Sequence, residues 1–277
     1  MTSTKHDPAQ TWFAKTLPPG SINYYATRFL PLTQQRTVAA IYALNETLFE
    51  LNDSAIDPTV SQAKLHWWHE EMQRLNQGQP THPITQCLVG IAPECLTAWL
   101  QAALALQSPV ILNTTEDLTH YCHQRYGIRE MAISLSLGFH TADDLSVAQR
   151  ASEIIGTNAL LQHALNTQQF EWIPHTLLRT ADFSAQTYQA APRASVSRLV
   201  DAFSPSLRAM LRRLGSVTLT PHNLVAARAV NLALAQYQQL RARPEKVSSL
   251  NRPCFNPLQL LWIAWRTKRQ GIYYSLD

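Results

Sequence analysis

Apolar residues recur at helical spacing along nearly the whole chain, and this periodicity constrains the fold more than any other feature of the sequence. Proline, glycine and capping residues fall at the breaks in the pattern, which is where helices begin and end. We therefore predict an all-α fold. The helices are expected near residues 21–29, 33–52, 59–77, 92–106, 114–140, 145–168, 193–214, 221–242 and 256–269.

Glycine is scarce, with only 8 among 277 residues. A doubly wound α/β fold needs glycine-rich turns after its strands, so the composition disfavours that class and glycine-rich phosphate loops with it. No internal repeat or convincing linker divides the chain. We predict one domain over residues 1–277, with residues 1–16 flexible. Two long connections are expected, residues 169–195 with one short helix and residues 242–257 as a mobile loop.

Cysteine spacing and hydropathy disfavour a secreted or membrane-spanning protein. The four cysteines form no CxxC pair, which favours reduced thiols in a cytosolic protein. The first residues lack the apolar stretch of a signal peptide, and no apolar run approaches 18 residues. We expect a cytoplasmic protein without a signal peptide or a transmembrane helix.

The net charge of +4 is unevenly distributed. Residues 1–192 carry 10 basic and 16 acidic side chains, whereas residues 193–277 carry 13 basic and 3 acidic ones. The basic part could face an anionic membrane surface, with the protein peripheral on the inner membrane, or an acidic protein partner. A solvated basic helical face explains the charge equally well. The arginines are spread through helical pattern, so no nucleic acid is expected as a partner.

An acidic helix end within residues 21–53 carries the first candidate site. Glu46, Glu50 and Asp53 are spaced by four and three residues, which returns them to one face of a helix. Acids grouped in this way suit Mg²⁺, which takes hard oxygen ligands and shares them with substrate phosphates. Phe49 lies in the middle of the cluster and can coordinate nothing. Solvated acids at a helix end are the simpler interpretation.

Several short segments, in order, resemble the squalene/phytoene synthase family. The order and spacing hold over roughly residues 17–180, and the resemblance implies an isoprenoid-synthase-like helical bundle around an apolar cavity. The C-terminal third carries little of it. The resembling segments are Ser21 to Ala26 (SFYYA-type opening), Arg36 with Ile41 to Leu44 (R…lYAF), Leu65 to Glu71 (LdwWreEl), His82 to Ile84 (HPv), Tyr121-Cys122 with Gly127 (YC…aG), and Ile155-Gly156 with Trp172 to Pro174 (lG…YlP).

The resemblance also implies a reaction and a set of site residues. Active members join two isoprenoid diphosphates head to head, and two facing acidic motifs hold Mg²⁺, which stabilises the departing diphosphate. Glu46, Glu50 and Asp53 would be the remnant of the first Mg²⁺–diphosphate motif, with Glu50 and Asp53 as metal ligands. No catalytic residue is assigned. The expected substrate-binding residues are Ser21, Tyr24, Tyr25, Arg28, Arg36, Tyr42 and Phe49.

The first acidic motif of the family has the form YAFcRxxDDxxD, and this chain matches it in part. Phe49 stands at the first Asp, Glu50 at the second and Asp53 at the third. Glu46 stands where the family has an arginine, so a cation has become an anion. Two of three acids remain.

The second acidic motif departs further from the family pattern. Asn166 and Thr167 stand at its Arg-Asp positions, and Glu171 is the only acid nearby. A neutral amide replaces a carboxylate poorly on Mg²⁺, which dehydrates reluctantly. Coupling of two prenyl substrates by the family mechanism is therefore not expected.

We expect a catalytically degenerate family member that binds an isoprenoid or lipid-like ligand, or that acts as an assembly or scaffold factor. One branch of the family assists assembly of respiratory complex I, and such a function needs no cofactor. The alternative is an active, divergent Mg²⁺-dependent prenyl transferase acting on isoprenoid diphosphates.

The segment 257–269 (PLQLLWIAWRTKR) contains two tryptophans and ends in cations. We predict a last core helix with basic residues well placed at its C-terminus, and a helix in a membrane interface is the alternative.

Overall fold

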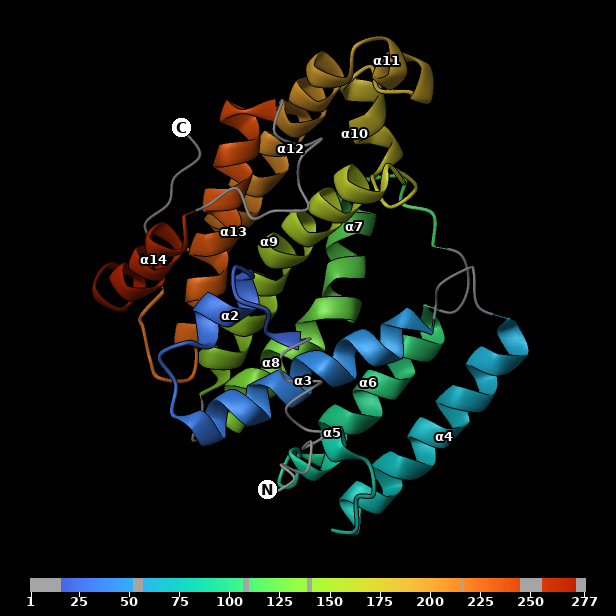
Figure 1. Cartoon of the computed structure of the whole chain (residues 1–277), viewed down its shortest axis with the longest axis vertical. Helices are drawn as coiled ribbons and strands as arrows, with labels where there is room; N and C mark the ends of the chain where they lie inside the picture. Colours follow the sequence, from blue (N-terminus) through green and yellow to red (C-terminus); the bar gives the residue numbers. More distant parts are fainter. Residues whose placement is uncertain are drawn as a thin grey trace, which may run out of the picture.

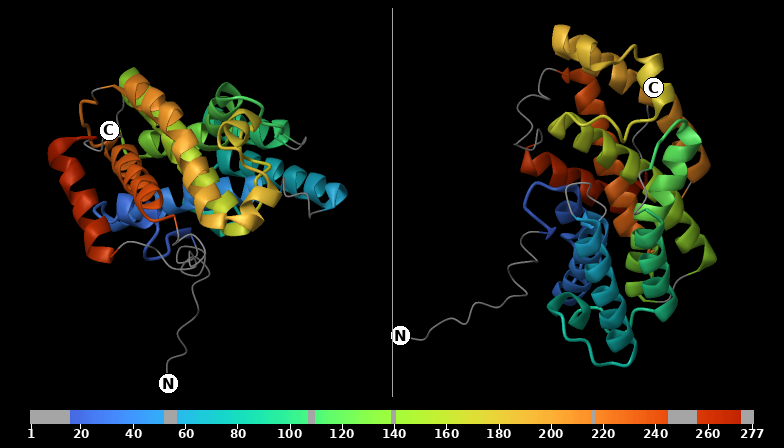
Figure 2. Two further views of the ribbon diagram at one scale, coloured as in Figure 1. Left: turned by 90° about the horizontal axis from the view of Figure 1, so that it is seen from above. Right: turned by 90° about the vertical axis from the view of Figure 1, so that its right-hand side faces the viewer.

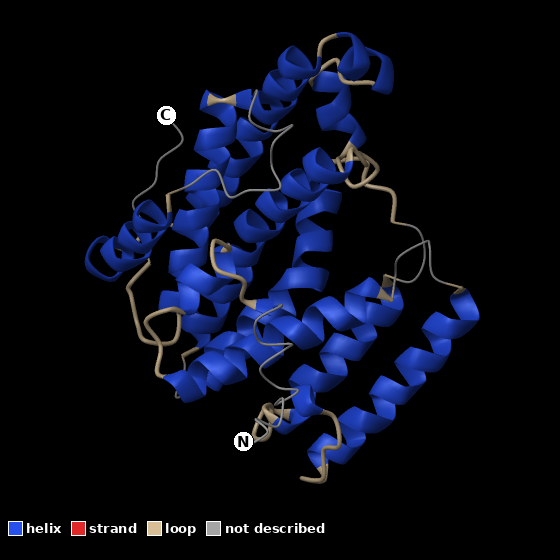
Figure 3. Ribbon diagram, in the orientation of Figure 1, coloured by secondary structure: helices blue, strands red, loops and turns tan. Residues whose placement is uncertain are grey.

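The computed structural model describes residues 16–51, 57–106, 110–138, 141–215, 217–244 and 256–272. These residues form helices and loops without a strand, as predicted (Figures 1 and 3). The helices are α2 (Ile22–Thr27), α3 (Leu32–Glu50), α4 (Pro58–Asn76), α5 (Pro83–Gln86), α6 (Pro93–Ala105), α7 (Thr115–Cys122), η1 (His123–Gly127), α8 (Ile128–Ser136), α9 (Ala142–Thr167), α10 (His175–Thr180), α11 (Ala185–Ala190), α12 (Pro192–Leu214), α13 (Leu224–Ala242) and α14 (Pro257–Gln270).

Helix α9 lies at the centre of the bundle (Figure 1). It contacts α7, η1, α8, α12 and α13, and most of its length is buried. Its buried residues include polar ones such as Glu153 and Asn158, which have hydrogen-bond partners on other elements. Helices α3 to α6 pack at one end of the molecule and α10 to α12 at the other (Figures 1 and 2).

The observed helices agree with the predicted ones to within a few residues, with three differences. The short helix α5, Pro83–Gln86, was not predicted. The single helix expected over residues 114–140 is interrupted by a π-helical turn, η1, between α7 and α8. The connection 169–195 holds two short helices, α10 and α11, where one was expected. Most of the two segments expected to be flexible, residues 1–16 and 242–257, lies outside the described residues, which omit 1–15 and 245–255.

A buried carboxylate joins α4 to the start of α5. Glu71 accepts hydrogen bonds from the backbone N–H groups of Thr81 and His82, both at 2.8 Å. It also accepts from the hydroxyls of Thr81 and Thr85 and from Nε of Arg74. Burial opposes ionisation, but these donors outweigh it and lower the pKa of Glu71 from 4.5 to about 2. The segments 65–71 and 82–84, which resemble the family separately, therefore meet in space.

Gly156 sets the approach of α9 to η1. A Cβ atom at this position would lie 2.6 Å from Cδ2 of Tyr126 and 2.7 Å from Sγ of Cys122. Such separations are far inside van der Waals contact, so the two helices pack this closely because the residue has no side chain.

None of the helices in the described ranges combines the length and the apolar character needed to cross a bilayer.

Candidate ligand-binding cleft

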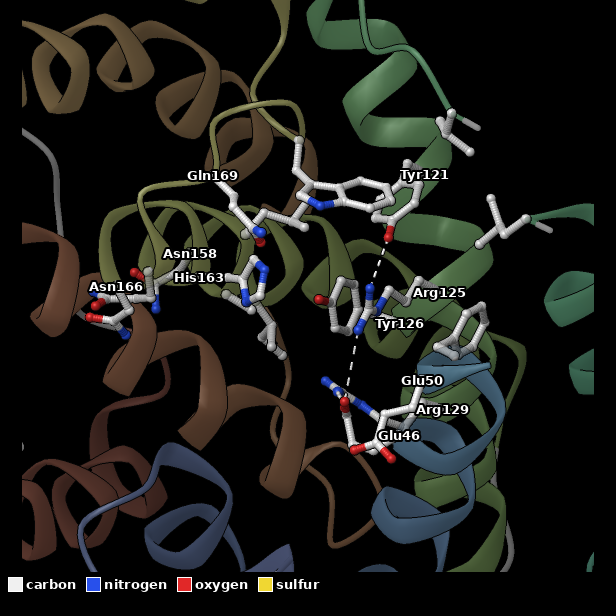
Figure 4. Close-up of a pocket in the computed structure, with 18 of the residues that line it drawn as sticks. Glu46, Glu50, Tyr121, Arg125, Tyr126, Arg129, Asn158, His163, Asn166 and Gln169 are labelled. Carbon is white, nitrogen blue, oxygen red and sulfur yellow. Dashed lines mark hydrogen bonds and ion pairs between the residues drawn. The ribbon is translucent and has the colours of Figure 1, made fainter. Parts of the chain in front are cut away.

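A cleft of about 1510 Å³ lies between the end of α3, the π-helical turn η1 and the C-terminal half of α9. Apolar side chains line part of it, including Phe49, Leu51, Ile155, Leu160 and Trp172. Its polar side chains fall on two opposed walls (Figure 4). We call the wall formed by α3, η1 and α8 the charged wall, and the wall formed by α9 and residues 168–172 the amide wall.

The charged wall contains two acids and two cations, and one of the acids lies near both cations. Glu46 and Glu50 come from α3, Arg125 comes from η1 and Arg129 comes from α8. The carboxylate of Glu46 lies 3.8 Å from Nη2 of Arg125 and 3.9 Å from Nη1 of Arg129. Phe49 is buried beneath them, with its ring centroid 5.6 Å from the guanidinium carbon of Arg125. The charge of Glu46 is therefore directed at two cations.

The two arginines are held by different partners. Nη1 of Arg125 donates to the hydroxyl of Tyr121 at 2.9 Å. Arg129 is buried, and its Nε and Nη2 donate to Oε1 of Glu130 at 2.9 and 2.7 Å. Burial lowers the pKa of Arg129, but the carboxylate of Glu130 outweighs burial and raises it above its ordinary value. Both guanidinium groups therefore remain charged at physiological pH.

The amide wall is almost free of formal charge. Helix α9 presents Asn158, Gln162, His163 and Asn166 to the cleft, and Gln169 follows at its end (Figure 4). Nδ2 of Asn158 donates to Gln236 on α13 at 3.0 Å. Glu171 is the acid that this wall contributes to the lining. One carboxylate cannot form a metal clamp of the kind that two facing acidic motifs provide.

Mg²⁺ does not fit the described side chains of the cleft. No group of three or more His, Cys, Asp or Glu residues in the described ranges is arranged to hold a metal ion. Glu46, the acid nearest the centre of the charged wall, faces two guanidinium groups, which repel a divalent cation. Glu50 is exposed at the edge of the cleft.

The family model described as squalene/phytoene synthase matches residues 19–259. The chain belongs to the squalene/phytoene synthase family. Solved structures of similar fold include a dehydrosqualene synthase in complex with a ligand, with 17% identity and a TM-score of 0.65 over 95% of this chain and 98% of that one. The squalene synthase HpnC from Alicyclobacillus acidocaldarius has 16% identity and a TM-score of 0.58, with 95% and 92% covered. A search of curated proteins gives no match.

The family assignment confirms the resemblance, and the structure shows where the expected first-motif residues lie. Glu46, Phe49 and Glu50 line the cleft together. Asp53, the other expected metal ligand, lies outside the described residues. Ser21 also lines the cleft, and its hydroxyl caps α2 by accepting a hydrogen bond from the N–H of Tyr24 at 3.1 Å.

Five other expected substrate-binding residues are not brought to the cleft. Tyr24 and Tyr25 pack edge to face with ring centroids 5.0 Å apart, and Tyr25 is buried in the core. Arg28 and Arg36 are exposed outside the cleft lining. Tyr42 is buried, with its ring 5.0 Å from the guanidinium carbon of Arg129. The prediction that these five residues contact a substrate is therefore not favoured by their positions.

Sequence reasoning missed Arg125 and Arg129, which line the cleft. They lie four residues apart around Gly127, in a segment noted only for the family's YC…aG pattern. The available signal was the pair of arginines four residues apart, a spacing that places them on one face of a helix.

Proposed function

We propose that this family member binds a single isoprenoid-type lipid in the cleft and does not couple two prenyl diphosphates. The observation that carries the proposal is the asymmetry of the two walls. Helix α9 presents amides and an imidazole where a second acidic motif would be needed, and Glu46 on the opposite wall faces two arginines. A mechanism with two metal-held diphosphates needs carboxylates on both walls.

A catalytically degenerate protein of this kind would act through its bound ligand or as an assembly or scaffold factor. The dehydrosqualene synthase of similar fold was solved with a ligand, and we extend ligand binding alone to this chain. The cleft is large enough for such a molecule and combines an apolar lining with a few polar groups, as lipid and cofactor sites do.

The test is to incubate purified protein with farnesyl or geranylgeranyl diphosphate and Mg²⁺ and to follow diphosphate release and hydrocarbon product. We expect neither, together with a rise in melting temperature caused by ligand binding to the folded state. Release of diphosphate with a condensed product would contradict the proposal and establish the prenyl transferase. In that case Glu50→Gln should abolish turnover.

A second function, docking on an anionic membrane surface, is favoured by helix α14. This helix lies at the edge of the molecule beyond α13 (Figures 1 and 2). Its inner face, as predicted for a core helix, is buried through Leu260, Ile263, Ala264 and Thr267. A second apolar stripe with the spacing i, i+3, i+4, i+7 is exposed on the opposite face, and consists of Leu258, Leu261, Trp262 and Trp265.

Cations border this exposed stripe. The guanidinium carbons of Arg266 and Arg269 lie 4.7 and 4.5 Å from the ring centroids of Trp262 and Trp265, and Lys268 completes the last turn. The helix carries no acid. Exposed tryptophans beside basic residues are typical of a helix that lies in a lipid interface and is attracted to anionic head groups.

Sedimentation with vesicles tests the docking surface. We expect binding to phosphatidylglycerol vesicles at low salt, weaker binding at high salt, and little binding to phosphatidylcholine. The double variant Trp262→Ser, Trp265→Ser should lose binding, whereas Leu104→Ser, an exposed apolar residue on α6, should not. Equal sedimentation of the double variant and the parent protein would exclude α14 as the docking surface.

A further inference from the structure

We infer that Arg125 and Arg129 form a metal-free seat for the phosphate head group of the bound lipid, and that Glu46 is the carboxylate which this head group displaces. The inference rests on the proposed function, because it assumes that a lipid occupies the cleft. It adds a chemical class, a phosphorylated lipid, and a mode of recognition in which guanidinium groups replace the magnesium ion.

Arg125 has hydrogen-bonding capacity that the described residues leave unused. A guanidinium group carries five N–H donors. Nη1 of Arg125 donates to Tyr121, but its Nε is buried and has no hydrogen-bond partner among the described residues. A buried donor without a partner is unfavourable by about 1–3 kcal/mol, so a ligand oxygen that accepts this hydrogen bond is stabilised.

Arg129 is preorganised by its neighbours and still points a nitrogen at the cleft. Glu130 accepts from its Nε and Nη2, and the ring centroids of Tyr42 and Tyr126 lie 5.0 and 4.9 Å from its guanidinium carbon. Nη1 remains directed at Glu46. Because these contacts fix the side chain before a ligand arrives, little conformational entropy is lost on binding.

Glu46 faces the two arginines but is held loosely. Its separations of 3.8 and 3.9 Å from their nitrogens exceed hydrogen-bond distance, and its side chain is 46% exposed. It therefore contributes charge without a specific bond. A phosphate oxygen at 2.7–2.9 Å would form charge-assisted hydrogen bonds that the carboxylate does not make.

The charges at this place also favour an exchange. Glu46 and Glu130 balance the charges of Arg125 and Arg129. Figure 4 shows Glu46 and the two arginines on the same wall of the cleft. When the flexible Glu46 side chain turns toward solvent, one uncompensated cation remains at the seat. A phosphate has more oxygens than a carboxylate, so it can accept hydrogen bonds from Nη2 of Arg125 and Nη1 of Arg129 at the same time.

The seat and a magnesium site predict opposite effects for one substitution. If Glu46 competes with the head group, Glu46→Gln removes the competitor and tightens binding. If Glu46 is a metal ligand, Glu46→Gln weakens binding.

The experiment is isothermal titration of the full chain with farnesyl diphosphate in the presence of EDTA, with farnesol as the probe for the tail alone. We expect Glu46→Gln to tighten farnesyl diphosphate binding several-fold and Arg125→Gln to weaken it by about tenfold or more. Farnesol binding should change in neither variant. Glu70→Gln is the matched control, because Glu70 is 47% exposed, lies 3.8 Å from Nη1 of Arg74 and is outside the cleft.

The outcomes separate the two proposals. Absence of binding by both probes would overturn the lipid-binding function and the seat with it. Farnesol binding without any gain from the diphosphate, or weaker diphosphate binding by Glu46→Gln, would overturn the seat alone. If Arg125→Gln does not fold, as judged by circular dichroism, the Glu46→Gln titration still decides the question.

Discussion

Two glutamates in two regions of the molecule show how differently one side chain can be used. Glu71, at the junction of α4 and α5, is fully buried and accepts hydrogen bonds from five donors. Glu46, in the cleft, is half exposed and lies 3.8–3.9 Å from its cationic neighbours without a hydrogen bond to them. Both belong to segments that resemble the family.

The difference shows that the number of hydrogen bonds an acid accepts indicates its role. The presence of an acid in a family segment does not. A carboxylate whose oxygens are saturated is part of the folded structure, because removing it leaves several buried donors without partners. A carboxylate held only by distant charge can move at little cost. Such a group is available for a ligand or for competition with one.

Phe49→Asp is expected to have the largest effect on stability, because it adds an acid to the charged wall beside Glu46. Phe49 is buried against Arg125, and its replacement by a small charged residue should lower the free energy of unfolding by about 4 kcal/mol. Urea denaturation measures this loss, and Phe49→Leu should cost about 1 kcal/mol. Although the variant restores the first motif's acid, we expect no Mg²⁺-dependent product, because the amide wall is unchanged. Product formation would show that this wall is not the obstacle.

Glu71→Gln should have the next largest effect. The amide brings two N–H donors into a site built of donors, so we expect a loss of about 3 kcal/mol at pH 7. Urea denaturation measures it, and Glu70→Gln on the exposed face of the same helix should change stability by less than about 0.5 kcal/mol. A change as small as the control's would mean that the junction does not stabilise the fold.

The stability difference between the parent protein and Glu71→Gln should also depend on pH. The folded-state pKa of Glu71 is depressed from 4.5 to about 2, so its contribution is complete above the unfolded-state value. It is lost as the pH falls from about 4.5 toward 2. The stability gap between the parent protein and Glu71→Gln should therefore be constant from pH 8 to 5 and shrink below pH 4.5. A gap that does not change with pH would show that packing, not charge, is responsible.

Glu46→Gln should have the smallest effect on stability, about 0.5 kcal/mol or less, because half-exposed ion pairs beyond hydrogen-bond distance contribute little. Thermal denaturation without ligand measures it. A loss as large as that of Glu71→Gln would mean that the two glutamates are equivalent and that Glu46 is structural.

The helices could be predicted from the sequence because their signals are local. Apolar periodicity and capping residues such as Thr114 and Thr141, both of which form capping boxes, act within a few residues. The neutrality of the amide wall was also predictable, because Asn166 stands at the arginine position of the second motif. In the structure Asn166 lines the cleft.

The cations of the cleft were not predictable in the same way. Arg28 was expected to bind substrate on the strength of the family resemblance, but it lies at the C-terminal end of a six-residue helix and is exposed. Arg125 faces the cleft from a π-helical turn that no periodicity of 3.6 residues indicates. Four of the five donors around Glu71 come from Thr81, His82 and Thr85, 10–14 residues further along the chain, and only the folded backbone brings them to the carboxylate.

The missing side chain at Gly156 has a consequence for the opening between the walls. Gly156 has only a hydrogen atom facing the Tyr126 ring of η1 and the Cys122 thiol of α7, so any larger residue there must displace one of these groups. A methyl group there would push both walls apart in a single step, altering tail and head-group binding together.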